Sequence, residues 1–167
     1  MFVMTYKMEE DKHEKHMRIV RVLCAVGITT AGAVIASFLT DTTSAWYQNL
    51  VLSPIQPPPW VFGAVWTVLY VLLAISFAHA VSKRDICRPA VIGFIINIIL
   101  NAMWSPIFFL LYAPVPALII MLALIANLIV LMRNVFSVSR PSFYLLIPYI
   151  SWLCIATVLN VSVIALN

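Results

Sequence analysis

Aromatic rings and side-chain amides recur at helical spacing in three segments of this sequence, and they are the groups best placed to do chemistry in it. The three sets are Phe62, Trp66 and Tyr70; Asn97, Asn101, Trp104 and Phe108; and Tyr149, Trp152, Ala156 and Asn160. Intervals of three and four residues place each set on one face of a helix. Apolar walls with a few polar anchors are typical of a small-molecule site. The pattern therefore favours noncovalent binding of a small ligand.

The composition indicates that the helices carrying these faces lie in a membrane. The chain is 63% hydrophobic and 10% charged, with a mean hydropathy of +1.04, whereas soluble domains are about half apolar and about one quarter charged. A helix needs about 20 apolar residues to cross the hydrocarbon, and five segments qualify, at residues 19–39, 60–82, 90–112, 115–132 and 143–166. We predict an all-α, multi-pass integral membrane protein with a five-transmembrane-helix bundle. Pro106 and Pro148 fall inside predicted spans and should mark kinks.

All 10 Lys and Arg residues fall on one side of such a bundle. They precede the first span or lie in the connections at residues 83–88 and 133–140. The positive-inside rule assigns that side to the cytoplasm, so we predict a cytoplasmic N-terminus. Residues 1–18 then form a charged cytoplasmic segment and residues 19–167 the transmembrane domain, in the cell (plasma) membrane if the source is prokaryotic. The lipid bilayer is the expected partner, and the net charge of +4 needs no nucleic acid to explain it.

Charged residues are absent from the middle of every predicted span. Ion-coupled transporters usually carry an ionisable group there, and the same absence removes the usual acids and bases of catalysis. A pump, a secondary transporter and a conventional enzyme are therefore disfavoured. His13 and His16, close to Glu14, offer a weak alternative metal site. A solvated, partly helical tail is the stronger interpretation, and we predict no metal site.

A proline-rich loop follows the first span, with prolines at 54, 57, 58 and 59. Proline fixes φ and lowers the entropy of the unfolded chain. We expect a semi-rigid lid over the outer end of the bundle, with Trp60 at the rim and Trp66 below it in a cavity. Asn101 would anchor the polar edge of a flat ligand stacked on the indoles. The alternative is structural: asparagines that join helices, aromatics that fill space, and Trp60 at the membrane interface.

Three motifs follow one another along the chain. They are Trp46-Tyr47-x-x-Leu50 with Pro57-Pro58-x-Trp60 and Trp66-x-x-Leu69-Tyr70; Asn101-x-x-Trp104-Ser105-Pro106-x-Phe108-Phe109; and Pro148-Tyr149-x-x-Trp152-x-x-x-Ala156-Thr157-x-x-Asn160. In this order they resemble the TspO/MBR family of tryptophan-rich sensory proteins, translocator proteins and peripheral-type benzodiazepine receptors. The resemblance covers about residues 20–167, including the number of spans.

The resemblance implies a five-helix bundle, commonly a homodimer, with a pocket open toward the first loop. It implies a membrane receptor or binding protein for porphyrins, such as protoporphyrin IX and haem, or for similar flat hydrophobic ligands. Tetrapyrrole sensing, transport or stress response would be its role, with the porphyrin as ligand and no cofactor required. The positions expected to line the pocket are Tyr47, Pro57, Pro58, Trp60, Trp66, Asn101, Trp104, Phe108, Trp152 and Ala156.

Other functions stay open at this point. The resemblance also implies light-dependent, photo-oxidative porphyrin degradation as an enzymatic alternative, with Trp66 and Trp152 as the residues that would carry it. Translocation of a lipid or sterol, or a scaffold role, is a further alternative. Residues 160–167 lack the Tyr and Arg of the family's sterol-recognition pattern, so the sequence does not support sterol binding. The first loop departs from the family as well, with Leu52, Ser53 and Ile55 where Lys/Arg, Pro and Trp are usual.

Overall fold

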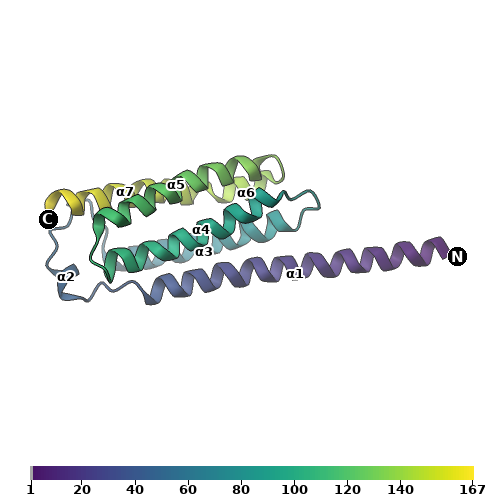
Figure 1. Cartoon of the computed structure of the whole chain (residues 1–167), viewed down its shortest axis with the longest axis horizontal. Coiled ribbons are helices and arrows are strands. Elements are labelled where there is room, and N and C mark those ends of the chain that lie inside the picture. The colour runs from purple at the N-terminus through teal and green to yellow at the C-terminus, as the bar shows by residue number, and fades with distance from the viewer. Residues whose placement is uncertain (1) are drawn as a thin grey trace.

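Seven helices make up the described part of the computed structural model, which comprises the backbone of residues 2–167 and side chains from residue 12 onward (Figure 1). The long helices are α1 (Phe2–Phe38), α3 (Pro59–Val81), α4 (Arg88–Phe109), α5 (Pro114–Phe136) and α7 (Ile147–Leu166). Two short ones, α2 (Ala45–Gln48) and α6 (Arg140–Leu145), precede α3 and α7. No strand occurs among these residues, and 5 segments are long and apolar enough to cross a membrane. The prediction of an all-α, five-span membrane protein is confirmed.

Proline sets the beginning of several of these helices. Pro59 and Pro114 open α3 and α5, positions where the missing N–H has no helical partner to lose. Pro106 lies inside α4, as the sequence indicated. Pro148 lies in the fifth span as the second residue of α7, and the helix is interrupted at Leu146 just before it, as the kink predicted at this proline requires. The fifth span is thus built from two helices, α6 and α7.

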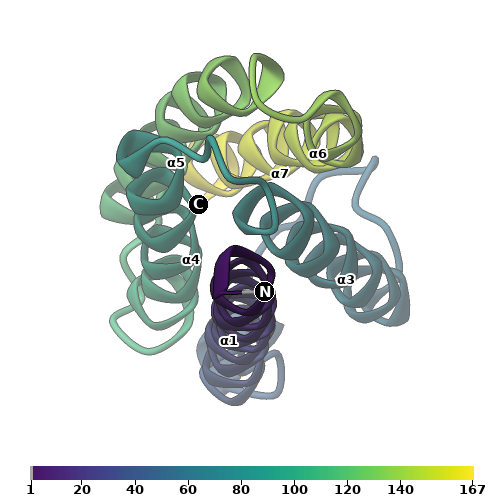
Figure 2. The same cartoon turned by 90° about the vertical axis from the view of Figure 1, so that its right-hand side faces the viewer.

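The long helices form a ring when viewed along the bundle (Figure 2). α1 packs on α3 and α4, α4 packs on α5, and α5 packs on α7. α3 meets the fifth span mainly through α6 and touches α7 at few positions. The boundary between α3 and α7 is therefore loosely closed.

Small residues on the buried face of α1 allow it to lie close to α4. Ala25, Thr29, Gly32 and Ala36 follow one another at intervals of four, three and four, and all are buried. A Cβ atom at Gly32 would collide with the side chain of Ile98 on α4. Glycine at this position therefore sets the approach of the two helices.

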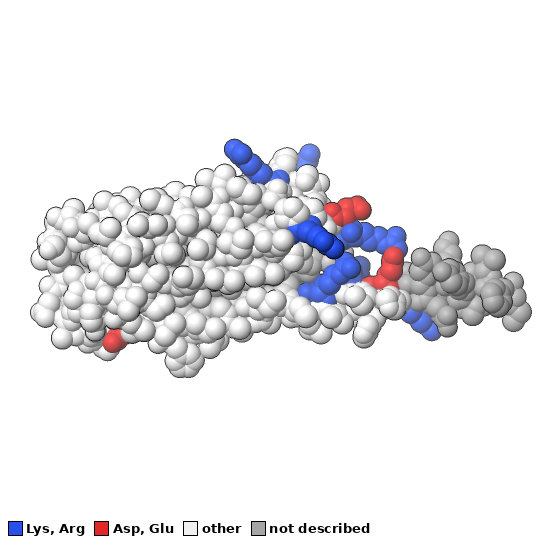
Figure 3. Space-filling view, viewed as in Figure 1, with Lys and Arg blue, Asp and Glu red and all other residues white. Residues whose placement is uncertain are grey.

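The Lys and Arg side chains gather at one end of the bundle, here called the cationic end (Figure 3). α1 extends beyond the other helices at this end, where Glu14 forms an ion pair with Arg84 from the α3–α4 connection. The clustering agrees with the sequence, while the cytoplasmic location of residues 1–18 stays a prediction. The side chains of Lys7, Glu9, Glu10 and Asp11 lie outside the described residues.

Three hydroxyls and one imidazole tie α6 to α3 at the cationic end. Ser139 Oγ lies 2.8 Å from His79 Nδ1 and 2.9 Å from Ser142 Oγ. The Ser76 hydroxyl on α3 donates to the carbonyl of Ser142 at 2.9 Å. These bonds satisfy polar groups that are buried between the helices. The fifth span is therefore fastened to α3 before the break at Leu146, and α7 is less closely held.

Residues 39–58 connect α1 to α3 and cover the opposite end of the bundle, here called the loop end (Figure 1). Ser44 caps α2 by accepting a hydrogen bond from the Tyr47 N–H at 3.3 Å. Asn167, beyond α7, accepts from the Val51 N–H at 2.9 Å and donates to the Val51 carbonyl at 3.1 Å. The cap orders the short helix within the loop, and the bonds to Asn167 fasten the middle of the loop to the end of α7.

Candidate functional site

Aromatic side chains of α3 and α7 face one another as an antiparallel series, here called the α3–α7 seam. The ring of Phe62 lies 5.7 Å from Trp152, and the ring of Trp66 lies 6.3 Å from Tyr149, both edge-on. Tyr70 continues the series on α3, with its ring 6.0 Å from Trp66. The pairing follows from spacing, because steps of four residues on α3 and three on α7 advance each helix by about one turn. The seam thus brings together faces from two spans far apart in sequence.

Tyr149 lies at the centre of this arrangement and connects it to α4. It is 1% exposed. Its hydroxyl oxygen accepts a hydrogen bond of 2.7 Å from the side-chain amide of Asn101, which is also buried. An amide exposed to lipid would be costly, so this bond keeps Asn101 inside the bundle.

Two buried hydrogen-bond donors in the seam have no partner among the described residues. They are the hydroxyl of Tyr70 and the indole nitrogen of Trp152. Most buried polar atoms in proteins are hydrogen-bonded, and leaving one unpaired costs about 1–3 kcal/mol. The side-chain oxygen of Asn97 is also unpaired, but Asn97 faces α5, where its nitrogen donates to Asn127 at 3.1 Å. Trp152 and Tyr70 therefore carry the two unpaired donors of the seam, whereas the Asn97 oxygen lies outside it.

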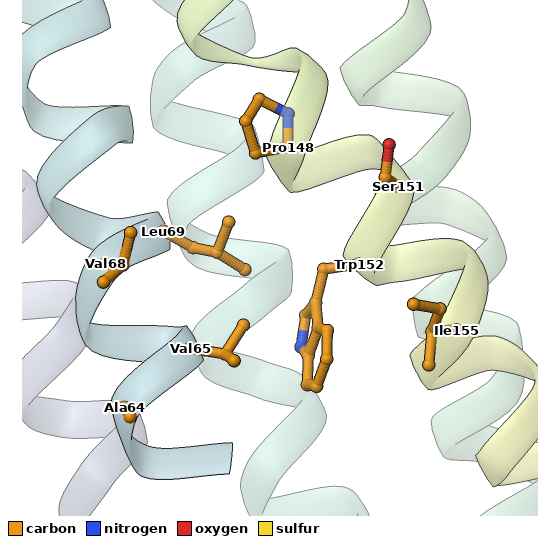
Figure 4. Close-up of a pocket in the computed structure, with 8 residues that line it drawn as sticks. All are labelled: Ala64, Val65, Val68, Leu69, Pro148, Ser151, Trp152 and Ile155. Carbon is orange, nitrogen blue, oxygen red and sulfur yellow. The ribbon is translucent and has the colours of Figure 1, made fainter. Parts of the chain in front are cut away.

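A hollow of about 490 Å³ lies between α3 and α7 at the seam (Figure 4). α3 contributes Ala64, Val65, Val68 and Leu69, and α7 contributes Pro148, Ser151, Trp152 and Ile155. In this view the Trp152 indole projects into the space between the two helices. Val68 and Ile155 are exposed on membrane-spanning segments, so the open side of the hollow faces the bilayer. Its volume lies within the roughly 300–1,000 Å³ usual for ligand pockets.

A second group of rings, the loop-end cluster, joins the first loop to α4. The ring of Trp46 lies 5.6 Å from Phe108, and that of Tyr47 lies 5.4 Å from Phe109. Trp104 stacks on Phe108 with ring centres 5.0 Å apart. Burial raises the pKa of the Tyr47 phenol, and a hydrogen bond with the Gln56 side chain opposes that rise.

The side chain of Asn160 forms two hydrogen bonds in the loop-end cluster. The Trp104 indole nitrogen donates to the side-chain oxygen of Asn160 at 3.2 Å. The Asn160 side-chain nitrogen donates in turn to the carbonyl of Pro114 at 3.0 Å. Asn160 therefore joins α4, α5 and α7, and both polar atoms of its side chain have a partner.

The structure divides the ten predicted pocket residues between these regions. Trp66 and Trp152 belong to the seam, Asn101 on α4 donates to its Tyr149, and Ala156 is buried one turn beyond Trp152. Of the predicted set, Trp152 is the residue that lines the hollow. Tyr47, Trp104 and Phe108 belong to the loop-end cluster. Pro57 and Pro58 lie in the loop, the first half-buried and the second exposed.

Trp60 and the opening of the hollow differ most from the sequence picture. Trp60 is 74% exposed at the start of α3 and does not line the hollow, and its exposure suits the membrane-interface alternative. The hollow opens sideways between α3 and α7, whereas the resemblance implied a pocket open toward the first loop. Phe62, Tyr70 and Tyr149 complete the seam but were absent from the predicted pocket set. Their helical spacing was the signal that could have added them.

Fold and site together define a multi-pass integral membrane protein in which five spans enclose aromatic side chains. The chain belongs to the TspO/MBR family, whose model matches residues 24–166.

Individual relatives agree with this assignment. The chain is 29% identical to "Tryptophan-rich protein TspO" of Chlorobaculum tepidum over 154 residues, covering 90% of this chain and 98% of the relative. It is 32% identical to "Protein CrtK" of Rhodobacter capsulatus over 145 residues, 85% of this chain and 89% of that one. It is also 28% identical to "Translocator protein" of Bos taurus over 146 residues, 81% and 85% of the two chains. The similarity therefore extends over nearly the whole bundle.

Proposed function

We propose that this protein is a membrane receptor for porphyrins, such as protoporphyrin IX or haem, or for similar flat hydrophobic ligands, bound at the α3–α7 seam. The observation that carries the proposal is the unpaired indole N–H of Trp152, a residue that lines a hollow open to the bilayer. Family membership is consistent with a tetrapyrrole ligand in sensing, transport or stress response. The homodimer expected for the family belongs to this proposal as well.

The seam supplies the interactions that such a ligand needs. A flat ring system can stack on or meet edge-on the rings of Trp66 and Trp152, and each such contact contributes about 0.5–1.5 kcal/mol beyond the area that it buries. The apolar wall between α3 and α7 removes the rest of the ligand from lipid and water. A hydrogen bond from the Trp152 indole N–H adds orientation as well as about 0.5–1.5 kcal/mol.

Titration of protoporphyrin IX into the full chain in phosphatidylcholine nanodiscs tests the proposal. Tryptophan quenching and the shift of the porphyrin absorption band give two independent readouts. We expect saturable binding that the Trp66→Phe, Trp152→Phe double variant weakens about tenfold, because about 1.4 kcal/mol corresponds to a factor of ten. Trp46→Phe is the matched control, since Trp46 lies in the loop-end cluster. Equally weak, unsaturated signals in the parent and the double variant would rule out the receptor and leave the scaffold role.

Light-dependent porphyrin degradation is a second candidate. It would depend on Trp66 and Trp152, and both rings lie in the α3–α7 seam. Trp66 and Trp152 both approach the seam from opposite helices, and Trp66 contacts both Tyr70 and Tyr149. Illumination with oxygen should then yield a bilin-like product, and the yield should fall in Trp66→Phe and in Trp152→Phe. Bleaching at the same rate without protein would exclude this activity while leaving binding intact.

A further inference from the structure

Hydrogen bonds fasten the fifth span near both of its ends. At the cationic end, the start of α6 is joined to α3 by the bond from Ser76 to the Ser142 carbonyl and by the contact between His79 and Ser139. Near the C-terminus of α7, the side chain of Asn160 is bonded to α4 and to α5. A ligand that passed at either end would have to break these bonds.

Between these ends, α7 meets α3 through side-chain packing alone. Among the residues whose side chains the structure describes, no hydrogen bond joins the two helices. Tyr149 is bonded to Asn101 on α4, and Ser151 donates to a carbonyl of its own helix. α3 and α7 also touch at few positions. Moving them apart locally therefore costs dispersion contacts but no hydrogen bond.

The opening of the hollow lies in this middle part of the seam and is here called the mouth. Ala64 and Val68 on α3 and Ser151 and Ile155 on α7 form it, and all four line the hollow and are exposed (Figure 4). The small side chains of Ala64 and Ser151 leave it free of bulky groups. Because all four residues lie in membrane-spanning segments, the hollow is reached directly from the lipid.

The loop end is closed by a different set of contacts. Both polar atoms of the Asn167 side chain are bonded to the Val51 backbone. The rings of Trp46 and Tyr47 pack on the aromatic side chains of α4. Lifting the first loop would break these two hydrogen bonds and expose aromatic surface at the same time. Opening at this end therefore costs more than opening at the mouth.

We propose that the ligand of the α3–α7 seam enters and leaves sideways, from the bilayer through the mouth, while the first loop stays closed. This route rests on the proposed receptor function and specifies how the site is reached. The ligand is then a flat hydrophobic molecule that is already dissolved in the membrane when it meets the protein. Side chains at the mouth control the rates of binding and release more than they control the affinity.

Temperature-jump relaxation of protoporphyrin IX, equilibrated with the full chain in phosphatidylcholine nanodiscs, measures entry and release within one membrane. Tryptophan quenching is the signal. The slope and intercept of the relaxation rate against porphyrin per lipid give the association and dissociation rate constants. We expect the Ala64→Phe, Ser151→Phe double variant to slow both about fivefold and to change Kd less than about twofold, because a narrower entrance raises the barrier to entry and exit alike.

Two further variants complete the comparison. Ala64→Phe alone narrows one wall and should slow both rates about twofold, so the test does not depend on the folding of the double variant. Ala126→Phe makes the same change on the exposed face of α5, away from the mouth, and should leave both rates unchanged. Unchanged rates in Ala64→Phe and in the double variant would overturn the proposed route while the receptor function stands. Faster release with weaker binding would also overturn it, since these residues would then hold the ligand.

Asn167→Ala tests the route through the loop end. It removes both side-chain bonds to Val51 and should leave the association rate as it is in the parent protein. Faster association in Asn167→Ala, with parental rates in the Ala64→Phe variant, would overturn the sideways route and assign entry to the loop end. Absence of saturable quenching in the parent protein would refute the receptor function, and the route with it.

Discussion

Trp104 and Trp152 lie in neighbouring parts of the same bundle but differ in whether the indole N–H has a hydrogen-bond partner. In the loop-end cluster, the Trp104 N–H donates to the side-chain oxygen of Asn160, and the Asn160 side-chain nitrogen donates to the Pro114 carbonyl. In the α3–α7 seam, the Trp152 nitrogen is buried but has no partner in the described part of the chain. The comparison teaches that residue type alone does not mark a binding site. A saturated hydrogen-bond network holds helices together, and an unsaturated one beside a hollow leaves capacity for a ligand.

The packing around Trp104 and Trp152 also differs. Trp104 is enclosed by Phe108 and Phe109, and the first loop packs over them. Trp152 contacts Phe62 and lines a hollow that opens toward lipid. We therefore assign the loop-end cluster to stability and the seam to ligand binding, and each of the following predictions tests that division.

Asn160→Leu should have the largest effect, because it removes both hydrogen bonds of the loop-end network at once. The Trp104 N–H and the Pro114 carbonyl would be left without their partner. We expect the free energy of unfolding to fall by about 2 kcal/mol, measured by reversible denaturation in mixed detergent micelles. A variant as stable as the parent protein would contradict the structural assignment of this cluster.

Replacing each tryptophan by phenylalanine sharpens the comparison directly. Trp104→Phe leaves the Asn160 oxygen unpaired and should cost about 1–2 kcal/mol of unfolding free energy. Trp152→Phe removes a nitrogen that has no partner, so the hydrogen-bond loss is absent and the cost should stay below about 1 kcal/mol. The same denaturation measurement on both variants suffices. Equal costs would mean that the two indoles have equivalent roles.

The two buried phenols of the seam provide a second matched pair. Tyr149→Phe removes the acceptor of the Asn101 amide and should lower the unfolding free energy by about 1 kcal/mol. Tyr70→Phe removes only an unpaired hydroxyl and should be neutral or slightly stabilising. Thermal unfolding without ligand measures both. Destabilisation by Tyr70→Phe would show that its hydroxyl is already satisfied in the folded protein.

The smallest effect concerns the loop that carries Trp46 and Tyr47 to the loop-end cluster. The hydroxyl of Thr43, followed by its backbone N–H, holds the pKa of Asp41 below the usual value of 3.8. Because the folded-state pKa is the lower one, this contribution to stability is present above pH 3.8 and is lost as pH falls through the folded-state pKa. Thr43→Val should move the pKa of Asp41 up toward 3.8, as carboxyl carbon NMR shifts would show. An unchanged titration would mean that the turn forms without these bonds.

Helical periodicity and hydropathy predicted much of the fold because they are local properties. The span expected at 60–82 is α3, within one residue at each end. The span expected at 90–112 is α4 (Arg88–Phe109). The fourth was expected to end at 132 but continues to Phe136, because Arg133 can extend toward the cationic end while its helix continues. The fifth span is interrupted at Leu146, two residues before Pro148, where the sequence predicted a kink because proline has no N–H to donate to the preceding turn.

The predicted site was less complete, and the reason is again physical. Spacing placed Trp66, Asn101 and Trp152 on inward faces, and the structure agrees with their direction. Spacing does not say which faces meet, and the pocket set that the resemblance implied joined Trp104 with Trp152 although their hydrogen-bond networks are separate. Trp60 was expected at the rim of a cavity or at the membrane interface, and it lies 74% exposed in the first turn of α3.

By itself, the amino-acid sequence determined that five apolar helices cross a membrane, that the cations collect at one end, and that aromatic and amide side chains share helical faces. Each of these depends on the order and chemistry of residues within one helix. Only the tertiary structure decided that Asn160 satisfies Trp104 while Trp152 stays unpaired beside an open hollow. These hydrogen-bond partners lie on different helices, so the packing of the helices decides which side chains meet. α3 packs mainly against α6 and little against α7.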